Sequence, residues 1–383
     1  MKFGIEREVL ADAVAWAARV LPTRSPVPVL CGLLLEADGD GLLRVSGLDH
    51  EASARIEVAA DVELPGRVLV MGRRLLDVCR VLPGGRVRCT VEGSRFAVSG
   101  GGARFGLSVL PRDDHPALPE PPEFRGEVDA GAFAAAVGQV VVASGRDEAL
   151  PVLTGIRLKV DGGTMTLAAT DRYRYAVRTL EWKPVAPDVS ADVVVPARRL
   201  AEIARSLDRP GTVRVALDGG TIGFGSDGMR MTARLLDGRL PGHDKLFALP
   251  EGAVAVAGRA PLLEAVRRVA VVAEGDSPLR LAFSAGSVRL RAGHEDDVAS
   301  QEVPVTLDGA TEMTVAFNPA YLVDALSSFE TQGVRFQLLG PGQRALLSGV
   351  PDAGSTEGKE GHEGGEGALD SHRHLLMSVK PQT

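Results

Sequence analysis

Alanine-rich stretches with apolar residues at helical spacing occur three times along the chain, and each is followed by a short, mostly apolar segment. Apolar residues that recur every three to four positions predict an amphipathic helix, whereas a short apolar or alternating run predicts a strand. The predicted helices are residues 9–21, 132–143 and 261–272, and the strands that follow them are residues 28–36, 151–159 and 277–283. Pro261 suits the first turn of the third helix, where its missing N–H costs nothing.

A second motif is an apolar strand that runs directly into a helix opened by two arginines. Residues 68–78 read VLVMGRRLLDV and residues 193–203 read VVVPARRLAEI, 125 positions later; residues 313–326 are a looser third copy. The helix-then-strand motif repeats at 123 positions. Two motifs in the same order at nearly the same offset indicate three copies of a unit of about 120 residues.

Each unit is expected to contain two helices and several antiparallel strands, with alternating strands such as residues 43–47 and 165–169 between the helices. This is an α+β layout with the helices on one face of a sheet. The expected domains are residues 1–120, 126–248 and 251–383. Proline-rich joints at residues 110–122 and 240–250 are stiff and are expected to fix the angle between neighbouring units.

Composition excludes several classes of protein. Aromatic residues are only 4% of the 383 residues, so the cores must be aliphatic. The opening residues lack the apolar core of an export signal, and no run approaches the roughly 18–20 apolar residues of a membrane span. Without an export signal, Cys31, Cys79 and Cys89 are interpreted as reduced thiols of a cytoplasmic protein.

Negative charge is concentrated in one segment near the end of the chain. Residues 352–370 carry six acidic side chains and one lysine, so they contribute −5 of the net charge of −7. The segment is rich in glycine and glutamate and lacks apolar periodicity, which predicts a surface loop. It is either a solvated insertion without function or a charged gate beside a neighbouring site. Comparing the affinity of one partner peptide for the full chain and for a variant without residues 353–368 distinguishes the two.

Patterns that could indicate an enzyme are weak. Residues 275–278 read GDSP, but no histidine is placed to act as its base. Residues 99–102 read SGGG and lack the Lys-Ser/Thr of a phosphate loop. His372 and His374 with His362 could ligate a metal, but an alternating strand beside a loop is a poor scaffold. We expect no catalytic residue, no metal and no cofactor.

Several segments carry a resemblance to a known family. They are MKF with ERE at residues 1–8, Arg24 before PVL at 28–30, TDRYR at 170–174, DGRLP at 237–241, FNPAYL at 317–322 and HLLM at 374–377. With the threefold repeat, their order and spacing identify the chain as similar to the bacterial DNA polymerase III beta subunit, the sliding clamp. The resemblance covers nearly the whole chain.

The resemblance implies a non-catalytic processivity factor, cytoplasmic and associated with the nucleoid rather than with a membrane. Two chains of three clamp units would form a head-to-tail homodimer, a six-unit ring with helices lining the hole and sheets outside. A head-to-tail contact makes a ring only if its rotation closes. The implied partners are duplex DNA, polymerase subunits and the clamp loader, which would be the component that uses ATP.

A ring held by topology needs an inner wall that attracts phosphates without reading bases, and Lys and Arg contacts do this. An acidic protein can still supply such a wall if basic groups line the hole. Arg24 matches a DNA-contacting loop of the family, Arg146 lies in the equivalent loop of the second unit, and the other candidates open or close equivalent helices. The predicted DNA-binding residues are Arg24, Arg73, Arg74, Arg80, Arg146, Arg198, Arg199 and Arg205.

The family also binds short, partly apolar peptides of its partners in a cleft between the second and third units. Aliphatic side chains and Met would form an adaptable apolar pocket, and Arg and Asn would bond the peptide. We expect residues 172–175 to be an exposed strand end. By position, the implied cleft residues are Leu153, Thr170, Arg172, Tyr173, Arg174, Tyr175, Pro241, Lys245, Leu246, Asn318, Tyr321, Leu375, Met377, Ser378 and Val379.

The family pairs the first unit of one chain with the third unit of the other, and Val271 and Val272 are the candidates for this dimer contact; the alternative is that they pack within their own unit. Three features depart from the family pattern: the acidic segment, the ending Ser378-Val379-Lys380, and Tyr175 where an aliphatic residue is common. All three alter the cleft. The alternatives are a diverged clamp paralogue with modified partner affinity, or a repeat-built interaction scaffold that never encircles DNA.

Overall fold

A computed structural model describes residues 1–383 except 120–121, 276, 295–296, 351–370 and 381–383. The acidic segment, Asp276 of the GDSP turn and His362 therefore lie outside the described residues. The chain divides into two compact units. Unit 1 holds residues 1–131, 183–186 and 202–235, and unit 2 holds residues 132–182, 187–201 and 236–383.

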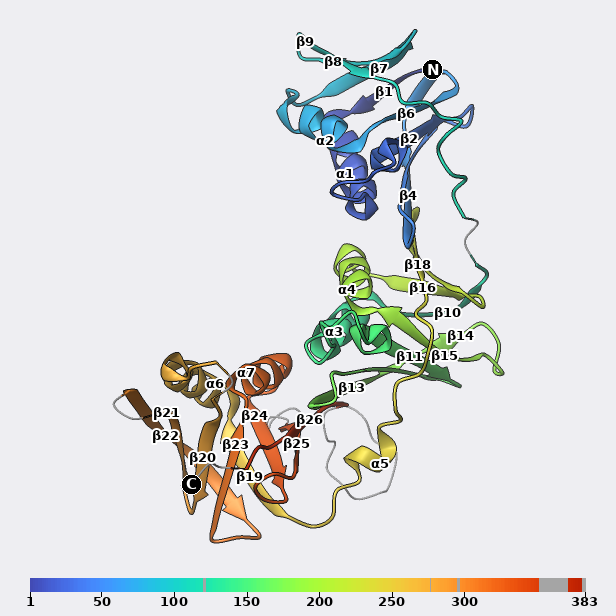
Figure 1. The fold of residues 1–383 in the computed structure, drawn as a ribbon. Coiled ribbons are helices and arrows are strands. Elements are labelled where there is room, and N and C mark those ends of the chain that lie inside the picture. Colours follow the sequence, from blue (N-terminus) through green and yellow to red (C-terminus); the bar gives the residue numbers. More distant parts are fainter. Residues whose placement is uncertain (120–121, 276, 295–296, 351–370, 381–383) are drawn as a thin grey trace. The chain divides into compact units, whose positions relative to one another are not determined.

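The order of elements confirms the threefold α+β repeat (Figure 1). Each repeat begins with a strand and a helix, continues through a run of antiparallel strands, adds a second helix and ends on three strands. In the first repeat these are β1 (Lys2–Glu6), α1 (Arg7–Ala17), β2 (Gly32–Ala37), β3 (Leu42–Leu48), β4 (Ala52–Ala59), β5 (Asp61–Leu64), β6 (Gly66–Met71), α2 (Gly72–Val81), β7 (Arg86–Glu92), β8 (Arg95–Gly100) and β9 (Ala103–Ser108).

The second and third repeats follow the same order. The second has β10 (Phe124–Asp129), α3 (Ala130–Val141), β11 (Gly155–Asp161), β12 (Thr164–Thr170), β13 (Arg174–Glu181), β14 (Lys183–Pro184), β15 (Ser190–Pro196), α4 (Ala197–Ser206), β16 (Thr212–Leu217), β17 (Thr221–Ser226) and β18 (Met229–Arg234). The third, after the short helix α5 (Asp244–Phe247), has β19 (Ala253–Gly258), α6 (Arg259–Val269), β20 (Leu279–Ser284), β21 (Ser287–His294), β22 (Asp297–Asp308), β23 (Glu312–Phe317), α7 (Pro319–Ser328), β24 (Gly333–Leu338), β25 (Arg344–Val350) and β26 (His372–Met377).

All three predicted strands that follow a helix begin later than expected: β20 by two residues, at Leu279, and the other two by four. Pro28–Cys31 and Pro151–Thr154 are single turns of 3-10 helix (η2 and η3), each with proline in its first turn, and the strands begin at Gly32 and Gly155. Proline fixes φ near −65° and donates no hydrogen bond, so it favours the start of a turn over a place in a ladder. A Cβ on Gly155 would lie 2.3 Å from Val194 Cγ1, so only glycine fits at the point where the turn enters the sheet.

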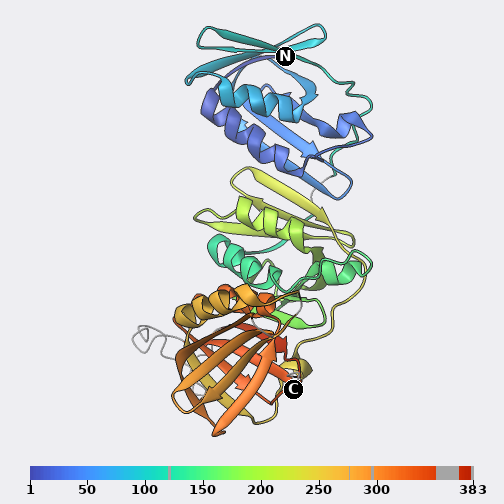
Figure 2. The same cartoon turned by 60° about the vertical axis from the view of Figure 1, so that its left-hand side comes forward.

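Unit 1 contains a five-stranded sheet, β5-β1-β7-β8-β9, and a nine-stranded sheet, β14-β10-β16-β17-β18-β4-β3-β2-β6. The larger sheet continues from the second repeat into the first because β18 pairs with β4, where Met229 lies opposite Ile56. Across this junction the buried hydroxyls of Ser53 and Thr232 are 2.7 Å apart. The helices α1 and α2 pack side by side, as Figure 2 shows.

Unit 2 contains one twelve-stranded sheet, β15-β11-β12-β13-β26-β25-β24-β19-β22-β21-β20-β23. Here β13 of the second repeat pairs with β26 of the third, with Tyr175 opposite Leu375 and Ala176 opposite His374. The helices α6 and α7 pack together against the third repeat's core, which is mainly aliphatic, as the composition predicts. In the part of the chain that is described, no helix is long and apolar enough to cross a membrane.

Two buried histidines lie in the strand that joins the second and third repeats. His372 is held by polar contacts, with Nε2 2.8 Å from Ser328 Oγ and Nδ1 3.2 Å from the carbonyl oxygen of Val177. His374 is fully buried, and among the described residues neither of its ring nitrogens has a hydrogen-bond partner. Burial lowers the pKa of His374 well below the ordinary value of 6.5, with further lowering from the neighbouring His372 and Arg174.

The free energy of unfolding should therefore decrease as the pH falls. The unfolded chain takes up a proton on His374 near pH 6.5 but the folded chain does not, so stability is lost progressively from about pH 6.5 downwards, by at most about 1.4 kcal/mol per pH unit for this group. We expect His374→Leu to flatten the fall in unfolding temperature between about pH 7.5 and pH 5. His50→Leu, at an exposed position, is the control. Equal pH dependence of the two variants would contradict this assignment.

Candidate functional site

An open pocket lies in unit 2 where the second and third repeats meet. Its cavity is about 330 Å³. Three segments form it: the loop after α3, the turn before β13, and the first turns of α7. The lining residues are Ser144, Gly145, Arg146, Asp147, Leu150, Leu153, Asp171, Arg172, Tyr173, Arg174, Ala320, Tyr321 and Asp324.

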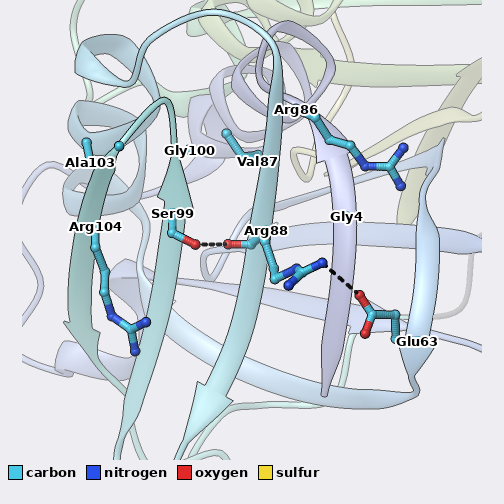
Figure 3. A pocket seen from close by; sticks show the side chains of 10 residues that line it. Gly4, Glu63, Arg86, Val87, Arg88, Ser99, Gly100, Ala103 and Arg104 are labelled. Atoms are coloured by element: carbon cyan, nitrogen blue, oxygen red, sulfur yellow. Dashed lines mark hydrogen bonds and ion pairs between the residues drawn. The ribbon is translucent and has the colours of Figure 1, made fainter.

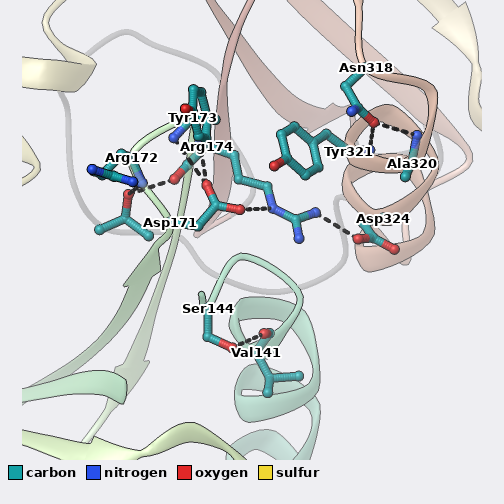
Figure 4. A network of polar contacts seen from close by, with 11 residues as sticks. Val141, Ser144, Asp171, Arg172, Tyr173, Arg174, Asn318, Ala320, Tyr321 and Asp324 are labelled. Atoms are coloured by element: carbon teal, nitrogen blue, oxygen red, sulfur yellow. Dashed lines mark hydrogen bonds and ion pairs between the residues drawn. The ribbon is translucent and has the colours of Figure 1, made fainter. Parts of the chain in front are cut away.

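Arg174 forms the base of the open pocket and links the two repeats (Figure 4). Its Nε donates to Asp171 Oδ2 at 2.9 Å and its Nη1 donates to Asp324 Oδ2 at 2.6 Å. The guanidinium also lies 4.3 Å from the centroid of the Tyr321 ring. Arg174 is 6% exposed, and a buried cation is tolerated only when it is paired and hydrogen-bonded. Removing one partner of such a pair typically costs about 3–5 kcal/mol.

The turn before β13 is shaped by side chains that bond to its backbone. Asp171 Oδ1 accepts from the backbone N–H groups of Tyr173 and Arg174, at 3.0 and 3.1 Å. Thr170 Oγ1 accepts from the N–H of Arg172 and donates to the carbonyl of Arg174. Within this turn Arg172 has φ +82°, in the left-handed region that disfavours residues with a Cβ. The turn presents Tyr173, which stacks on Tyr321 with ring centroids 6.4 Å apart.

A second group of predicted residues lies on the opposite face of the same strands. Neighbouring residues of a strand point to opposite faces, so Tyr175 points away from Arg174. Its ring packs with Phe247 and Leu375, and this group, with Ala168, Val177 and the partly buried Leu246, Leu249 and Leu346, is here called the Tyr175 cluster. The Tyr175 hydroxyl donates to the carbonyl oxygen of Pro241 at 2.6 Å. Burial raises the pKa of this phenol.

The structure places some of the predicted cleft residues in each of these two places and the others outside both. Leu153, Arg172, Tyr173, Arg174 and Tyr321 line the open pocket; Tyr175, Pro241, Leu246 and Leu375 belong to or bond with the Tyr175 cluster. Met377 and Val379 are each 40% exposed, Lys245 is exposed on α5, and the buried Ser378 bonds to backbone carbonyls. Asn318 caps α7 by accepting from the N–H groups of Ala320 and Tyr321.

The expectation that residues 172–175 form an exposed strand end is half wrong. Arg172 and Tyr173 are exposed, but Arg174 and Tyr175 are buried, the latter at 2% exposure. Arg174 is buried because two carboxylates and a ring surround its charge, and Tyr175 because the segment 241–247 packs on it. The missed residues are Asp171, Asp324 and Phe247. Asp324 follows Tyr321 by three positions, so helical spacing alone places both on one face of α7.

The arginines predicted to contact DNA lie on exposed surfaces, with Arg199 partly covered. Arg73, Arg74 and Arg80 project from α2, where Arg80 is 3.8 Å from Asp77. Arg198, Arg199 and Arg205 belong to α4. Arg24 lies in the loop after α1, and Arg146 lines the open pocket. Sequence reasoning missed Arg267 and Arg268, which close the last turn of α6.

Another group of arginines lies on the five-stranded sheet of unit 1 (Figure 3). Its cavity, about 510 Å³, is lined by Arg86, Arg88 and Arg104. Each arginine has an acidic neighbour: Arg86 pairs with Asp61, Arg88 is 3.7 Å from Glu63 and Arg104 is 2.6 Å from Glu92. The local charge is therefore compensated. Among the described residues, no group of three or more His, Cys, Asp or Glu side chains could hold a metal.

Fold and site together define a protein of three α+β repeats with a small, partly polar cleft where the last two repeats meet. Models of the N-terminal, central and C-terminal domains of the DNA polymerase III beta subunit match residues 1–119, 127–242 and 247–358. The chain is 47% identical to the beta sliding clamp of Streptomyces coelicolor and 41% identical to the beta sliding clamp homolog GriR of Streptomyces muensis, over 99% of each chain. It matches the crystal structure of the Pseudomonas aeruginosa beta subunit with a TM-score of 0.89 and 28% identity over 100% of both chains.

The chain belongs to the DNA polymerase III beta subunit family, the beta sliding clamps. This confirms the resemblance found in the sequence and the function that goes with it, that of a processivity clamp in DNA replication. A solved Pseudomonas aeruginosa clamp bound to griselimycin has a TM-score of 0.90 to this chain at 28% identity. The match over the whole chain does not favour the alternative, a diverged clamp paralogue or a repeat-built interaction scaffold that does not encircle DNA.

The strained turn generates a stability prediction. A non-glycine residue in the left-handed region costs about 1–2 kcal/mol, and glycine loses about 0.5–1 kcal/mol more backbone entropy than other residues on folding. We therefore expect Arg172→Gly to stabilise the protein by up to about 1 kcal/mol, measured as a higher unfolding temperature. Arg172→Ala is the matched control because it removes the same side chain but keeps the strain. An unfolding temperature of Arg172→Ala at or above that of Arg172→Gly would rule out this account.

Proposed function

We propose that two copies of this chain close head to tail into a ring around duplex DNA and hold polymerases there through the cleft. The observation that carries the proposal is the match of all three clamp domains, in order, along one chain.

Two unpaired strand edges support a head-to-tail contact. In the five-stranded sheet of unit 1, β9 is the last strand, and its outer edge has no partner strand among the described residues. In unit 2, residues 297–304 of β22 pair only with β21, so their other edge is also unpaired within the described part. Exposed edges are normally protected or covered, because they pair readily with another chain. One edge from each unit gives a heterologous contact, the type that forms rings.

Apolar side chains lie near both strand edges. On β9, Phe105 and Leu107 are only partly buried. Beside β22, the 3-10 turn Ala270–Val272 exposes Val271, which is 81% accessible. Val272, in contrast, packs against the core of the third repeat, so of the two predicted dimer residues Val271 is the better candidate. We propose that Val271 meets the apolar side chains of the partner's β9.

The arginines of α2 and α4, with Arg24, are proposed to face the DNA. All but the partly covered Arg199 are exposed, on the two helices or, for Arg24, in the loop after α1, and a sequence-independent phosphate contact requires exposed basic groups. Arg267 and Arg268 would extend the set to the third repeat. Arg146 lines the open pocket, so it is proposed to act at the cleft as well as near DNA.

The cleft is proposed to bind short peptide segments of polymerases and of the clamp loader. The open pocket combines the rings of Tyr173 and Tyr321 with charged groups, and the Tyr175 cluster places buried apolar side chains on the other face of the strands. Such a site suits an extended peptide with both polar and apolar side chains. The protein itself is proposed to be non-catalytic and cytoplasmic, with no cofactor of its own.

The ring predicts a stable dimer in solution. Light scattering should give about 80 kDa, twice the chain mass of 40.2 kDa, and this mass should persist on dilution through the micromolar range. Val271→Glu should shift the equilibrium to the 40 kDa chain, because a charge would be buried at the contact. Val185→Glu, at another exposed valine, is the control and should stay dimeric. A wild-type monomer at every concentration would contradict ring closure and favour a scaffold that does not encircle DNA.

The proposed inner wall predicts a specific salt dependence. Removing two phosphate contacts with Arg73→Gln and Arg74→Gln should weaken binding to duplex DNA and reduce the slope of log K against log salt by up to about 1.8, between about 50 and 200 mM salt. The control is Arg86→Gln with Arg88→Gln, two arginines that are also exposed but lie beside acidic side chains on the five-stranded sheet. If both double variants reduce the slope of log K against log salt by the same amount, the binding is nonspecific attraction. The assignment of α2 to the DNA side then fails. Retention on circular but not linear DNA after loading tests the ring itself.

A further inference from the structure

Tyr175 is the central side chain of the Tyr175 cluster, the apolar half of the proposed cleft. The residue lies at the second position of β13, between Thr170 of β12 and Leu375 of β26. Its hydroxyl bonds to the Pro241 carbonyl at 2.6 Å, and its ring meets the edge of Phe247 with centroids 5.7 Å apart. The side chain therefore spans from the sheet to the segment 241–247.

The contacts on both sides of Tyr175 hold it in this position. On the sheet side, Leu375 and Val177 pack against it, and on the other side Leu246 and Phe247 close over it. A buried phenol usually keeps its hydroxyl hydrogen-bonded, because burying a hydroxyl without a partner is unfavourable. The Pro241 carbonyl oxygen accepts the hydrogen bond of the Tyr175 hydroxyl. A ligand side chain that enters between β13 and Pro241 must first break the bond and move the ring.

The two halves of the cleft therefore differ in access. The open pocket has a cavity of about 330 Å³ and lies on the Arg174 face of the strands. The Tyr175 cluster lies on the other face. Met377 follows Leu376 of β26, and its N–H donates to the carbonyl of Tyr173 at 2.9 Å. Met377 is 40% exposed. A peptide can reach the open pocket directly, but it reaches the apolar half only where Tyr175 gives way.

We propose that Tyr175 is an internal occupant of the apolar half of the cleft and that a partner peptide binds fully only by displacing it. This inference rests on the proposed peptide-binding function and adds a residue that sets specificity. The ligand it selects is an extended peptide whose apolar side chain competes with a tyrosine ring. Peptides with a weak apolar end should bind through the open pocket alone.

The test uses the full-length protein and a fluorescently labelled peptide, the clamp-binding segment of the replicative polymerase of the same cell. Tyr175→Leu removes the occupant and leaves an aliphatic wall, so the peptide should bind roughly tenfold or more tightly, as expected for burying one aliphatic side chain. Tyr175→Phe keeps the ring but loses the Pro241 bond, and it should bind a few-fold more tightly. Tyr321→Ala removes a wall of the open pocket and should weaken binding.

The outcomes separate this proposal from the proposed function. If the wild type binds, Tyr321→Ala weakens binding and Tyr175→Leu binds no more tightly than the wild type, then the cleft is used but Tyr175 is not an obstacle. If neither the wild type nor any variant binds, the peptide-binding function itself fails, and this proposal fails with it.

A second measurement decides the question if Tyr175→Leu does not fold. The chain has three tyrosines, so protein labelled with 3-fluorotyrosine should give three fluorine NMR signals. The Tyr175 signal is the one that Tyr175→Phe lacks. Saturating peptide should move it strongly, because the ring leaves Phe247 and enters a different environment. Movement of the other two signals with the Tyr175 signal unchanged would overturn the proposal.

Discussion

Strand pairing across repeat boundaries is the constraint on which the rest of this structure depends. β18 of the second repeat pairs with β4 of the first, and β13 of the second pairs with β26 of the third. In each case one continuous sheet replaces two exposed edges, so the backbone groups of both strands are satisfied. The sequence predicted stiff proline-rich joints, and hydrogen-bonded sheets connect the repeats as well. The cleft is a product of the second junction: pairing β26 with β13 brings Leu375 beside Tyr175 and places α7 where Asp324 can reach Arg174.

The junction between β13 and β26 also explains why polar groups are buried there. Arg174 carries a charge into the interior and is stabilised only because Asp171, Asp324 and the Tyr321 ring surround it. His374 occupies the same face without a partner for its nitrogens among the described residues. Replacing a buried ion pair by well-packed apolar side chains often leaves the free energy of unfolding unchanged or raises it. The paired charge instead fixes one arrangement of α7 against the turn at residues 170–174, and that arrangement forms the open pocket.

The repeat, the fold class and the positions of the helices could be predicted from the sequence because they depend on local periodicity and on repetition. The starts of β2 and β11 could not, because the proline at residues 28 and 151 favours a turn where an apolar run predicts a strand. The burial of Arg174 depends on Asp324, 150 positions away, and no local pattern reveals such a partner. The opposite faces of Arg174 and Tyr175 could have been predicted from strand alternation, which assigns them to different halves of the cleft.

The position of β26 in the sequence has a consequence for the order in which the protein is made. β13 is synthesised nearly 200 residues before the strand that covers it, since Val177 pairs with Arg373. Domains fold in order as they are synthesised, at about 5–20 residues per second. During that interval β13 lacks its partner strand, and the Tyr175 cluster lacks Leu375. Nascent chains of this protein therefore lack the apolar half of the cleft until β26 has been made, so a peptide that needs this half cannot bind before then.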